Sequence, residues 1–328
     1  MTLQRLLFQA RLVRVSIVAL MLAFILALVG ACGSSGEPGA GGDTEEGQTS
    51  AGETGEYPLT IADSVGREVE IGEEPQRIAS MAPSITEALF EVGAGDRVVG
   101  VTSADDYPPQ VEEIEEVGSC GGPSVEAVVA QEVDLLMLSF DSTTAEEADT
   151  LEEQTGASVV VVNPTTVDEA IDTVGTVGQI TGNAEEAEGI EEDLRAELEE
   201  ISAAVEGREA PSVFYEVFDE PLQTAGGGSF IGDAITLAGG ENIAAEAGED
   251  YPQYSVEQLL NQDPEYYLLG GSTGVTPEDV EARENFGSLA AVEEGNVVVI
   301  DDELVSRPGP RIVEGIREMA EVLHPEAF

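Results

Sequence analysis

Short apolar runs alternate with helical stretches along most of this chain, and one long helical stretch interrupts the alternation near its middle. The apolar runs lie at residues 77–81, 98–101, 135–138 and 159–162 before the interruption, and at 213–217, 266–269 and 297–300 after it. Alternation of Val-rich strands with helices predicts a parallel sheet covered by helices on both faces. The pattern therefore predicts an α/β protein with two lobes, each built on a parallel-rich sheet.

The interrupting segment, residues 184–206, has the apolar periodicity of one amphipathic helix. Its apolar side chains recur on a single stripe, which consists of Ile190, Leu194, Leu198, Ile201 and Val205. At about 1.5 Å per residue such a helix spans about 34 Å, enough to connect two lobes. We therefore expect residues 57–183 to form the first lobe, 184–207 the linking helix and 208–328 the second lobe, with a ligand cleft between the lobes.

The first 31 residues have the pattern of a secretory signal peptide. A positively charged start is followed by an apolar run at 15–29, and then by Gly30 and Ala31 directly before Cys32. Small residues before a cysteine at this point predict cleavage before Cys32 and lipidation of its thiol. An uncleaved membrane helix is the alternative, although the apolar run is at the short end of the spanning range. Either interpretation places the rest of the chain outside the cytoplasm.

Residues 32–56 are rich in Gly, Ser, Glu and Thr and have almost no apolar side chains. Such a segment cannot bury enough surface to order itself, so we expect a flexible tether between the lipid and the lobes. With Cys32 lipidated, Cys120 is the only other cysteine. An intramolecular disulfide is therefore not expected, and Cys120 is interpreted as an unreactive thiol.

The composition excludes several classes of function. Asp and Glu number 67 against 12 Lys and Arg, and a net charge of −55 argues against nucleic-acid binding, which needs a basic surface. His324 is the only histidine and ends the last predicted helix, so no Ser-His-Asp, Cys-His or zinc site can be built around it. The acidic runs at 105–106 and 301–303 could bind a hard cation, but solvated surface is the simpler interpretation. We therefore expect no catalytic residue, metal or cofactor.

One short motif occurs twice, at matching places in the two halves of the chain. Ser124, Val125 and Glu126 recur as Ser255, Val256 and Glu257, each followed by a predicted buried strand. Each glutamate lies in the first turn of a helix capped by serine, where it complements the helix dipole. The dipole explains either glutamate alone, but it does not predict both at matched positions. One carboxylate on each lobe could be recognised by two basic pockets of one partner.

Candidate ligand contacts are aromatic side chains and one arginine. The aromatic residues near predicted strand-to-helix junctions are Tyr107, Phe140, Tyr215, Phe218, Phe230 and Tyr251. Ligands of open α/β sheets bind at such junctions, at the carboxyl ends of parallel strands. Arg307 stands out because arginine is scarce here, and it lies in a Pro- and Gly-rich loop. Gly226 to Gly228 precede a predicted helix, and we interpret them as a closely packed loop rather than an anion cradle.

Several segments resemble one family, the helical-backbone (class III) substrate-binding proteins of ABC importers for cobalamin, iron-siderophores and haem. The matching segments are residues 77–87, 93–101, 106–109, 124–126, 239–243, 251–253 and 255–260. The resemblance implies two lobes bridged by one long helix, and it implies that Glu126 and Glu257 dock on arginines of the permease. The likeness at 106–109 and 251–253 is strongest to the cobalamin-binding branch.

In that branch the resemblance implies that the stretch from Glu303 to Arg307 contacts the corrinoid, and that Phe140 and Tyr251 stack on it. Tyr107 and Phe218 complete our predicted ligand site. The branch often has Trp at the positions of Cys120 and Tyr251, so a ferric siderophore or haem stays an alternative ligand. An enzyme related to the metal chelatases is a distant alternative. The implied partners are an ABC permease and its ATPase, with the chain itself a lipid-anchored monomer.

Overall fold

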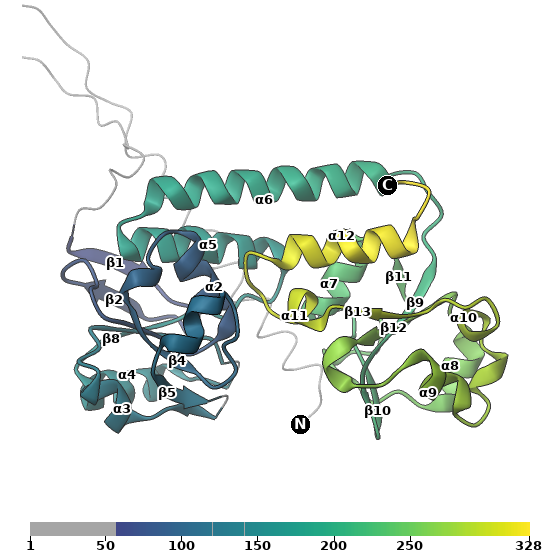
Figure 1. Ribbon diagram of the computed structural model, residues 1–328, viewed down its shortest axis with the longest axis horizontal. Helices are drawn as coiled ribbons and strands as arrows, with labels where there is room; N and C mark the ends of the chain where they lie inside the picture. The colour runs from purple at the N-terminus through teal and green to yellow at the C-terminus, as the bar shows by residue number, and fades with distance from the viewer. Residues whose placement is uncertain (1–56, 120, 141) are drawn as a thin grey trace, which may run out of the picture. The chain divides into compact units, whose positions relative to one another are not determined.

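The computed structural model describes residues 57–119, 121–140 and 142–328. The predicted signal peptide, the lipidation site at Cys32, the predicted tether at 32–56 and Cys120 lie outside the described residues. The rest of the chain folds around two sheets, each with helices on both faces (Figure 1). Within the described residues, no helix combines the length and the apolarity that crossing a membrane requires.

The first lobe contains a six-stranded sheet with the order β6-β5-β4-β3-β7-β8. All neighbouring pairs are parallel except β5 and β6. The strands are β3 (Ile78–Ser80), β4 (Val98–Thr102), β5 (Glu116–Ser119), β6 (Gly122–Pro123), β7 (Leu135–Leu138) and β8 (Ser158–Val161). An antiparallel pair, β1 (Leu59–Ala62) and β2 (Glu68–Ile71), precedes this sheet, and Gly66 turns between them with a φ of 82°.

The second lobe contains a five-stranded sheet in which β10, β9, β12 and β13 follow one another and β11 also pairs with β9. Only the β9–β10 pair is antiparallel. The strands are β9 (Ser212–Asp219), β10 (Leu222–Thr224), β11 (Glu241–Asn242), β12 (Tyr266–Gly270) and β13 (Val297–Ile300).

The helices fall into two sets according to the lobe that they cover. Those of the first lobe are α2 (Pro83–Glu91), α3 (Val125–Ala130), α4 (Ala145–Thr155) and α5 (Val167–Thr181), and α6 (Ala184–Val205) follows them. Those of the second lobe are α7 (Phe230–Leu237), α8 (Val256–Gln262), α9 (Pro277–Ala282), α10 (Ala290–Glu293), α11 (Asp302–Val305) and α12 (Ile312–Leu323).

Alternate side chains of the central strands enter two different cores, as the two-residue period of a strand requires. In β7, Leu135 and Met137 pack toward α2, α5 and α6, whereas Leu136 and Leu138 pack toward α3 and α4. In the second lobe one face of the sheet packs on α7 and α12, and the other packs on α8, α9 and α10. The helices α3 and α8 therefore cover the sheet faces that do not pack on α6.

The helix α6 joins the two lobes, as the sequence predicts. Ala187 near its start is buried in the first lobe, and Ile201 near its end is buried in the second. The helix α5 runs beside α6 (Figure 1). It also contributes to both cores, but it begins in the second lobe and ends in the first. Its early residues Val167 and Ile171 belong to the core of the second lobe, and Ile180 belongs to that of the first. Two adjacent helices thus contribute to both cores.

The helix after the apolar run at 77–81 does not begin at a serine cap. Ser84 has a capping side chain, but Ala82 is the N-cap of α2 and Pro83 is its first helical residue. Proline has no N–H to lose at this position, so the helix can begin two residues earlier than a cap at Ser84 would allow. Ser84 is instead buried within α2. This placement matters because the start of α2 contacts the second lobe.

Candidate functional site

Arg307 and Asp106 form an ion pair between the two lobes. Asp106 lies in the loop after β4, and Arg307 lies between α11 and α12. Arg307 Nη1 is 2.7 Å from Asp106 Oδ1, and Nη2 is 3.0 Å from Oδ2. Hydrogen bonds from Arg307 hold the pKa of Asp106 below its usual range, although burial opposes the shift. The bidentate geometry fixes the planes of both groups relative to each other.

Glu87 and Arg311 form a second bidentate pair beside the first. Glu87 lies on α2 with only 3% of its side chain exposed, and Arg311 is the N-cap residue of α12. Arg311 Nε and Nη2 lie 3.0 and 2.7 Å from the two carboxylate oxygens of Glu87. The guanidinium carbon of Arg311 also lies 4.0 Å from the centre of the Tyr107 ring, a cation–π contact.

Glu303 completes the charged cluster from α11. Its Oε1 lies 3.7 Å from Arg307 Nη2, and half of its side chain is exposed. Burial raises the pKa of Glu303; the charge of Arg307 opposes this rise and that of Asp106 adds to it. For Arg307, burial disfavours the charged form, but the carboxylates of Asp106, Glu303 and Glu87 outweigh burial and raise its pKa. We call Glu87, Asp106, Glu303, Arg307 and Arg311 the charged cluster.

Two features position the second-lobe half of the charged cluster. Asp301 caps α11 by accepting the Glu303 N–H at 3.0 Å. Asp302 accepts the hydroxyl of Tyr215 at 3.0 Å and that of Ser272, which ties α11 to the end of the sheet. Asp301 and Asp302 are therefore engaged with protein groups and do not form an open cation site. Among the described residues, no group of three His, Cys, Asp or Glu side chains is arranged to hold a metal ion.

Glycine lets the two lobes approach each other closely. A Cβ added at Gly309 would lie 3.1 Å from both Cα and Cβ of Ser84, at the start of α2. The loop that carries Arg307 and Arg311 therefore rests on the first lobe through backbone contact. Of these residues, only Arg307 was predicted from the sequence as a member of the site; Glu87 and Arg311 were not. The available signal was the spacing of two scarce arginines four positions apart in one loop.

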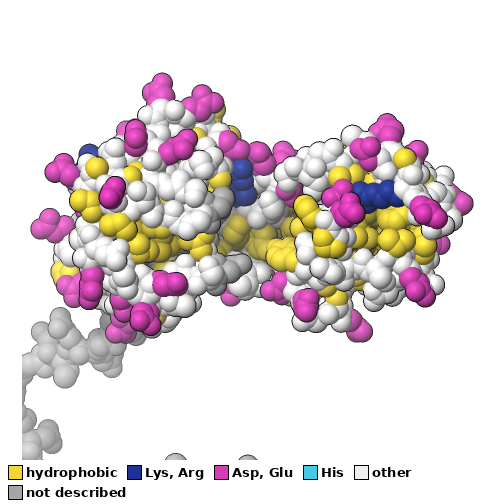
Figure 2. Space-filling model, turned by 90° about the horizontal axis from the view of Figure 1, so that it is seen from below, with side chains coloured by type: hydrophobic (Ala, Val, Ile, Leu, Met, Phe, Trp, Pro, Cys, Tyr) yellow, Lys and Arg dark blue, Asp and Glu magenta, His cyan; other side chains and the backbone are white. Residues whose placement is uncertain are grey.

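Exposed aromatic rings lie on both lobes near the carboxyl ends of strands. Tyr107 is 43% exposed, Phe218 49% and Tyr251 45%. Phe218 pairs with Gln223 across β9 and β10, and Gln223 bridges Gln253 in turn, so Phe218 and Tyr251 lie on adjoining segments. Figure 2 shows apolar side chains gathered in a band across the face seen from below, with acidic side chains along its edges. A contiguous exposed apolar surface of this kind is a candidate site for a ligand or a partner.

Phe140 lies two residues beyond β7, at the carboxyl end of that strand. It is partly buried against the core between the sheet and α3 and α4. It lines a cavity of ≈ 350 Å³ together with Pro123, Leu138 and Leu151. None of the residues that line this cavity belongs to the charged cluster, so Phe140 and the cluster lie in separate parts of the predicted site.

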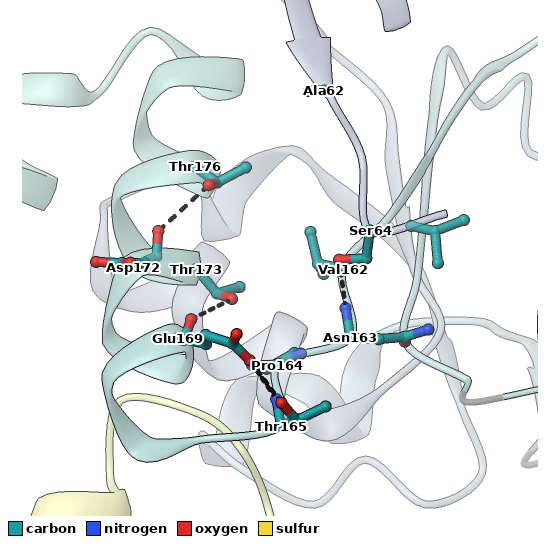
Figure 3. Close-up of a pocket in the computed structure, with 11 residues that line it drawn as sticks. Ala62, Ser64, Val162, Asn163, Pro164, Thr165, Glu169, Asp172, Thr173 and Thr176 are labelled. Carbon is teal, nitrogen blue, oxygen red and sulfur yellow. Dashed lines mark hydrogen bonds between the residues drawn. The ribbon is translucent and has the colours of Figure 1, made fainter. Parts of the chain in front are cut away.

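A hollow of ≈ 380 Å³ lies between α5, the hairpin of β1 and β2, and the end of β8 (Figure 3). Its hydroxyl groups are already engaged: Thr173 and Thr176 donate to the main-chain carbonyls of Glu169 and Asp172, at 3.0 and 3.2 Å. Thr165 donates both its N–H and its hydroxyl to the Glu169 carboxylate. The hollow includes none of the residues that the sequence predicts for ligand binding.

Glu126 and Glu257 are both exposed and both lie in the first turn of a short helix. Ser124 accepts the Ala127 N–H at the start of α3, and Ser255 accepts the Gln258 N–H at the start of α8. The predicted caps are therefore present in both lobes. Because α3 and α8 cover equivalent faces of their sheets, the two carboxylates occupy matched positions.

Two other predictions concern His324 and the glycine-rich loop. His324 ends α12 as expected, and it is buried with its Nε2 3.1 Å from the Gly239 carbonyl oxygen, so it does not reach the site. Gly226 is closely packed, because an added Cβ would lie 2.1 Å from the carbonyl oxygen of Glu249. The loop from Gly226 to Gly228 is therefore a close-approach turn, as predicted.

Comparison with known proteins gives consistent matches over most of the described residues. A family described as periplasmic binding protein matches residues 78–304. An ABC transporter substrate-binding lipoprotein of Bacillus subtilis is 31% identical over 83% of this chain and 87% of its own length. A cobalamin-binding protein of Halobacterium salinarum is 32% identical over 82% of this chain and 74% of its own.

Among solved structures, the periplasmic vitamin B12 binding protein of Vibrio cholerae superposes with a TM-score of 0.67 at 26% identity. The match covers 76% of this chain and 97% of that protein.

Proposed function

Because the chain belongs to the periplasmic binding protein family, we propose that it captures cobalamin or a related corrinoid outside the membrane and delivers it to an ABC permease. The observation that carries the proposal is the pairing of exposed rings on both lobes with an arginine that joins the lobes. Apolar rings provide area for a large planar ligand, and a few fixed polar groups set its orientation. The names of the relatives from Halobacterium salinarum and Vibrio cholerae favour the same ligand.

Each predicted ligand contact has a physical role in this proposal. Tyr107, Phe218 and Tyr251 would stack on or flank the corrinoid, and Phe140 would contact it from the end of β7. Arg307 and Glu303 would hydrogen-bond to its polar substituents at the lobe junction. The protein does no chemistry on the ligand, and the members of its family are binding components of transporters.

Delivery is the second half of the proposal. We propose that Glu126 and Glu257 dock on basic pockets of the permease, which works with an ATPase subunit. Cys32 would carry the lipid, and residues 32–56 would act as the tether. A tethered monomer meets its permease at a high effective concentration, which shortens the search for each new docking event. The proposed units are the signal peptide at 1–31, the tether, and the two lobes on either side of 184–207.

Titration with three ligand classes tests the ligand assignment. We expect the full chain, purified in detergent, to bind cyanocobalamin with a sub-micromolar Kd, on the order of 8 kcal/mol or more of binding free energy. Ferric enterobactin-type catecholates and haem should bind at least about tenfold more weakly. Isothermal titration calorimetry gives all three values under one buffer condition. Tighter binding of the ferric chelate or of haem would replace cobalamin with that ligand.

Substitution of Arg307 by alanine should weaken cyanocobalamin binding about tenfold. The change removes the group that bridges Asp106 and Glu303, so it loosens the lobe junction and removes a donor to the ligand. Arg317→Ala is the matched control, because Arg317 pairs with Glu197 on α6, away from the strand ends. An unchanged Kd for Arg307→Ala would remove this residue from the site.

A further inference from the structure

The charged cluster contains more negative than positive charge. Its carboxylates are Glu87, Asp106 and Glu303, and its guanidinium groups are Arg307 and Arg311. Three carboxylates face two arginines, so one negative charge is left in excess. A ligand that reaches the lobe junction therefore meets a site that is slightly negative, although two arginines lie in it.

The arginines of the charged cluster are already engaged by protein carboxylates. Asp106 takes both Nη groups of Arg307, and Glu87 and Glu303 lie 3.4 and 3.7 Å from the same guanidinium. Arg311 gives two hydrogen bonds to Glu87, and its face lies on the ring of Tyr107. A ligand anion would have to displace a carboxylate that is held at the same group by two hydrogen bonds.

The other arginines of the described residues cannot take over this role. Seven of the nine arginines in the described ranges have a carboxylate within 4.0 Å, and the remaining two are Arg77 and Arg208. Arg77 and Arg208 donate to the main-chain carbonyls of Gln131 and Ala204. Arg77 directly precedes β3 and Arg208 precedes β9, so both lie at the amino ends of strands, opposite the ligand side.

We propose that Asp106 is a specificity-determining residue: by neutralising Arg307 at the lobe junction, it makes the site accept neutral or cationic ligands and reject ligands that carry a carboxylate there. The inference rests on the proposed function and adds the charge class of the ligand. An anion placed beside the excess carboxylate loses its hydration without gaining a free cationic partner, and like charges at close range cost several kcal/mol. The repulsive element is what discriminates between ligands of equal shape.

The test uses two ligands that differ by one charge on the same scaffold. These are cyanocobalamin and its monocarboxylic acids, in which one side-chain amide is hydrolysed. The full chain in detergent is titrated with cyanocobalamin and with each isolated isomer. We expect at least one isomer to bind wild type at least about tenfold more weakly, which is about 1.4 kcal/mol. In Asp106→Asn the same ratio should fall to about twofold, because Arg307 becomes available to the ligand carboxylate.

Two further variants separate charge from structure. Glu303→Gln removes a second carboxylate from a half-exposed position, and it should also lower the ratio. Asp96→Asn changes an exposed aspartate of the first lobe, which also carries Asp106, but outside the charged cluster. It should leave the ratio at the wild-type value. Equal binding of all isomers to wild type, or an unchanged ratio in Asp106→Asn, overturns the inference while the proposed function stands. Binding of neither corrinoid overturns both.

Discussion

Replacing Glu126 and Glu257 together with alanine should abolish ligand uptake and leave the Kd for cyanocobalamin within about twofold of wild type. Both side chains are exposed on α3 and α8, on the sheet faces that do not pack on α6. Removing them costs the fold almost nothing, since exposed substitutions change the free energy of unfolding by less than about 0.5 kcal/mol. Docking should suffer far more, because truncating one partner of a desolvated charge pair costs about 2–5 kcal/mol at each site.

The measurement is uptake of labelled cyanocobalamin by cells in which the variant replaces the wild-type chain, paired with calorimetry on the purified protein. Glu153→Ala with Glu281→Ala is the matched control, since these are also exposed glutamates, one on each lobe. The control should transport normally. Normal uptake by the Glu126 and Glu257 double variant would refute the docking role, and so would a large loss of ligand affinity.

Replacing Glu216 with alanine should lower the free energy of unfolding by about 3–5 kcal/mol. Glu216 lies on β9 with its side chain fully buried, and it accepts two hydrogen bonds from Arg283, at 2.5 and 2.8 Å. It also accepts the hydroxyl of Tyr267. The hydrogen bonds to Glu216 raise the pKa of Arg283 despite its partial burial. Without Glu216, a guanidinium that stays charged at every physiological pH loses the buried carboxylate that pairs with it.

Urea unfolding followed by circular dichroism measures the effect, with Glu281→Ala as the exposed control in the same lobe. The double variant Glu216→Leu with Arg283→Leu sharpens the test. It removes both charges and keeps apolar volume beside Phe286, so it should recover most of the lost stability. If the double variant were no more stable than Glu216→Ala, the loss would come from the cavity and not from the unpaired charge.

The layout of the lobes could be predicted from the sequence because the pattern is local. The predicted strands at 135–138 and 297–300 are β7 and β13, and the last predicted helix, which His324 ends, is α12. Each has a long or uniform apolar run, so its period is legible without knowledge of its neighbours. The short strands β6 and β11 consist of two residues each and owe their conformation to a partner strand. Such short elements have no local hydrophobic period from which they could be predicted.

The site was partly predictable for the same reason. Arg307 was recognised because a rare residue in an unusual loop is visible in one sequence. Glu87 was not, because it lies among 67 acidic residues and is distinguished only by its 3% exposure. Its partner Arg311 is 224 positions away in the sequence. The residues near Glu87 form no local pattern that indicates this contact. A pair formed between lobes is a property of tertiary structure alone.

The sharing of two helices between both cores determines how the molecule can come apart. The helices α5 and α6 each bury apolar side chains in both lobes. Unfolding of either lobe therefore removes the helices that cover one face of the other lobe's sheet. The pair should therefore melt in a single calorimetric transition, and a fragment cut between α5 and α6 should not fold on its own. The same sharing makes wide hinge opening expensive, because it would pull Ile171 or Ile201 out of a core. Ligand exchange must then rely on small rotations, and any partner that opened the lobes widely would have to break apolar contacts in a core.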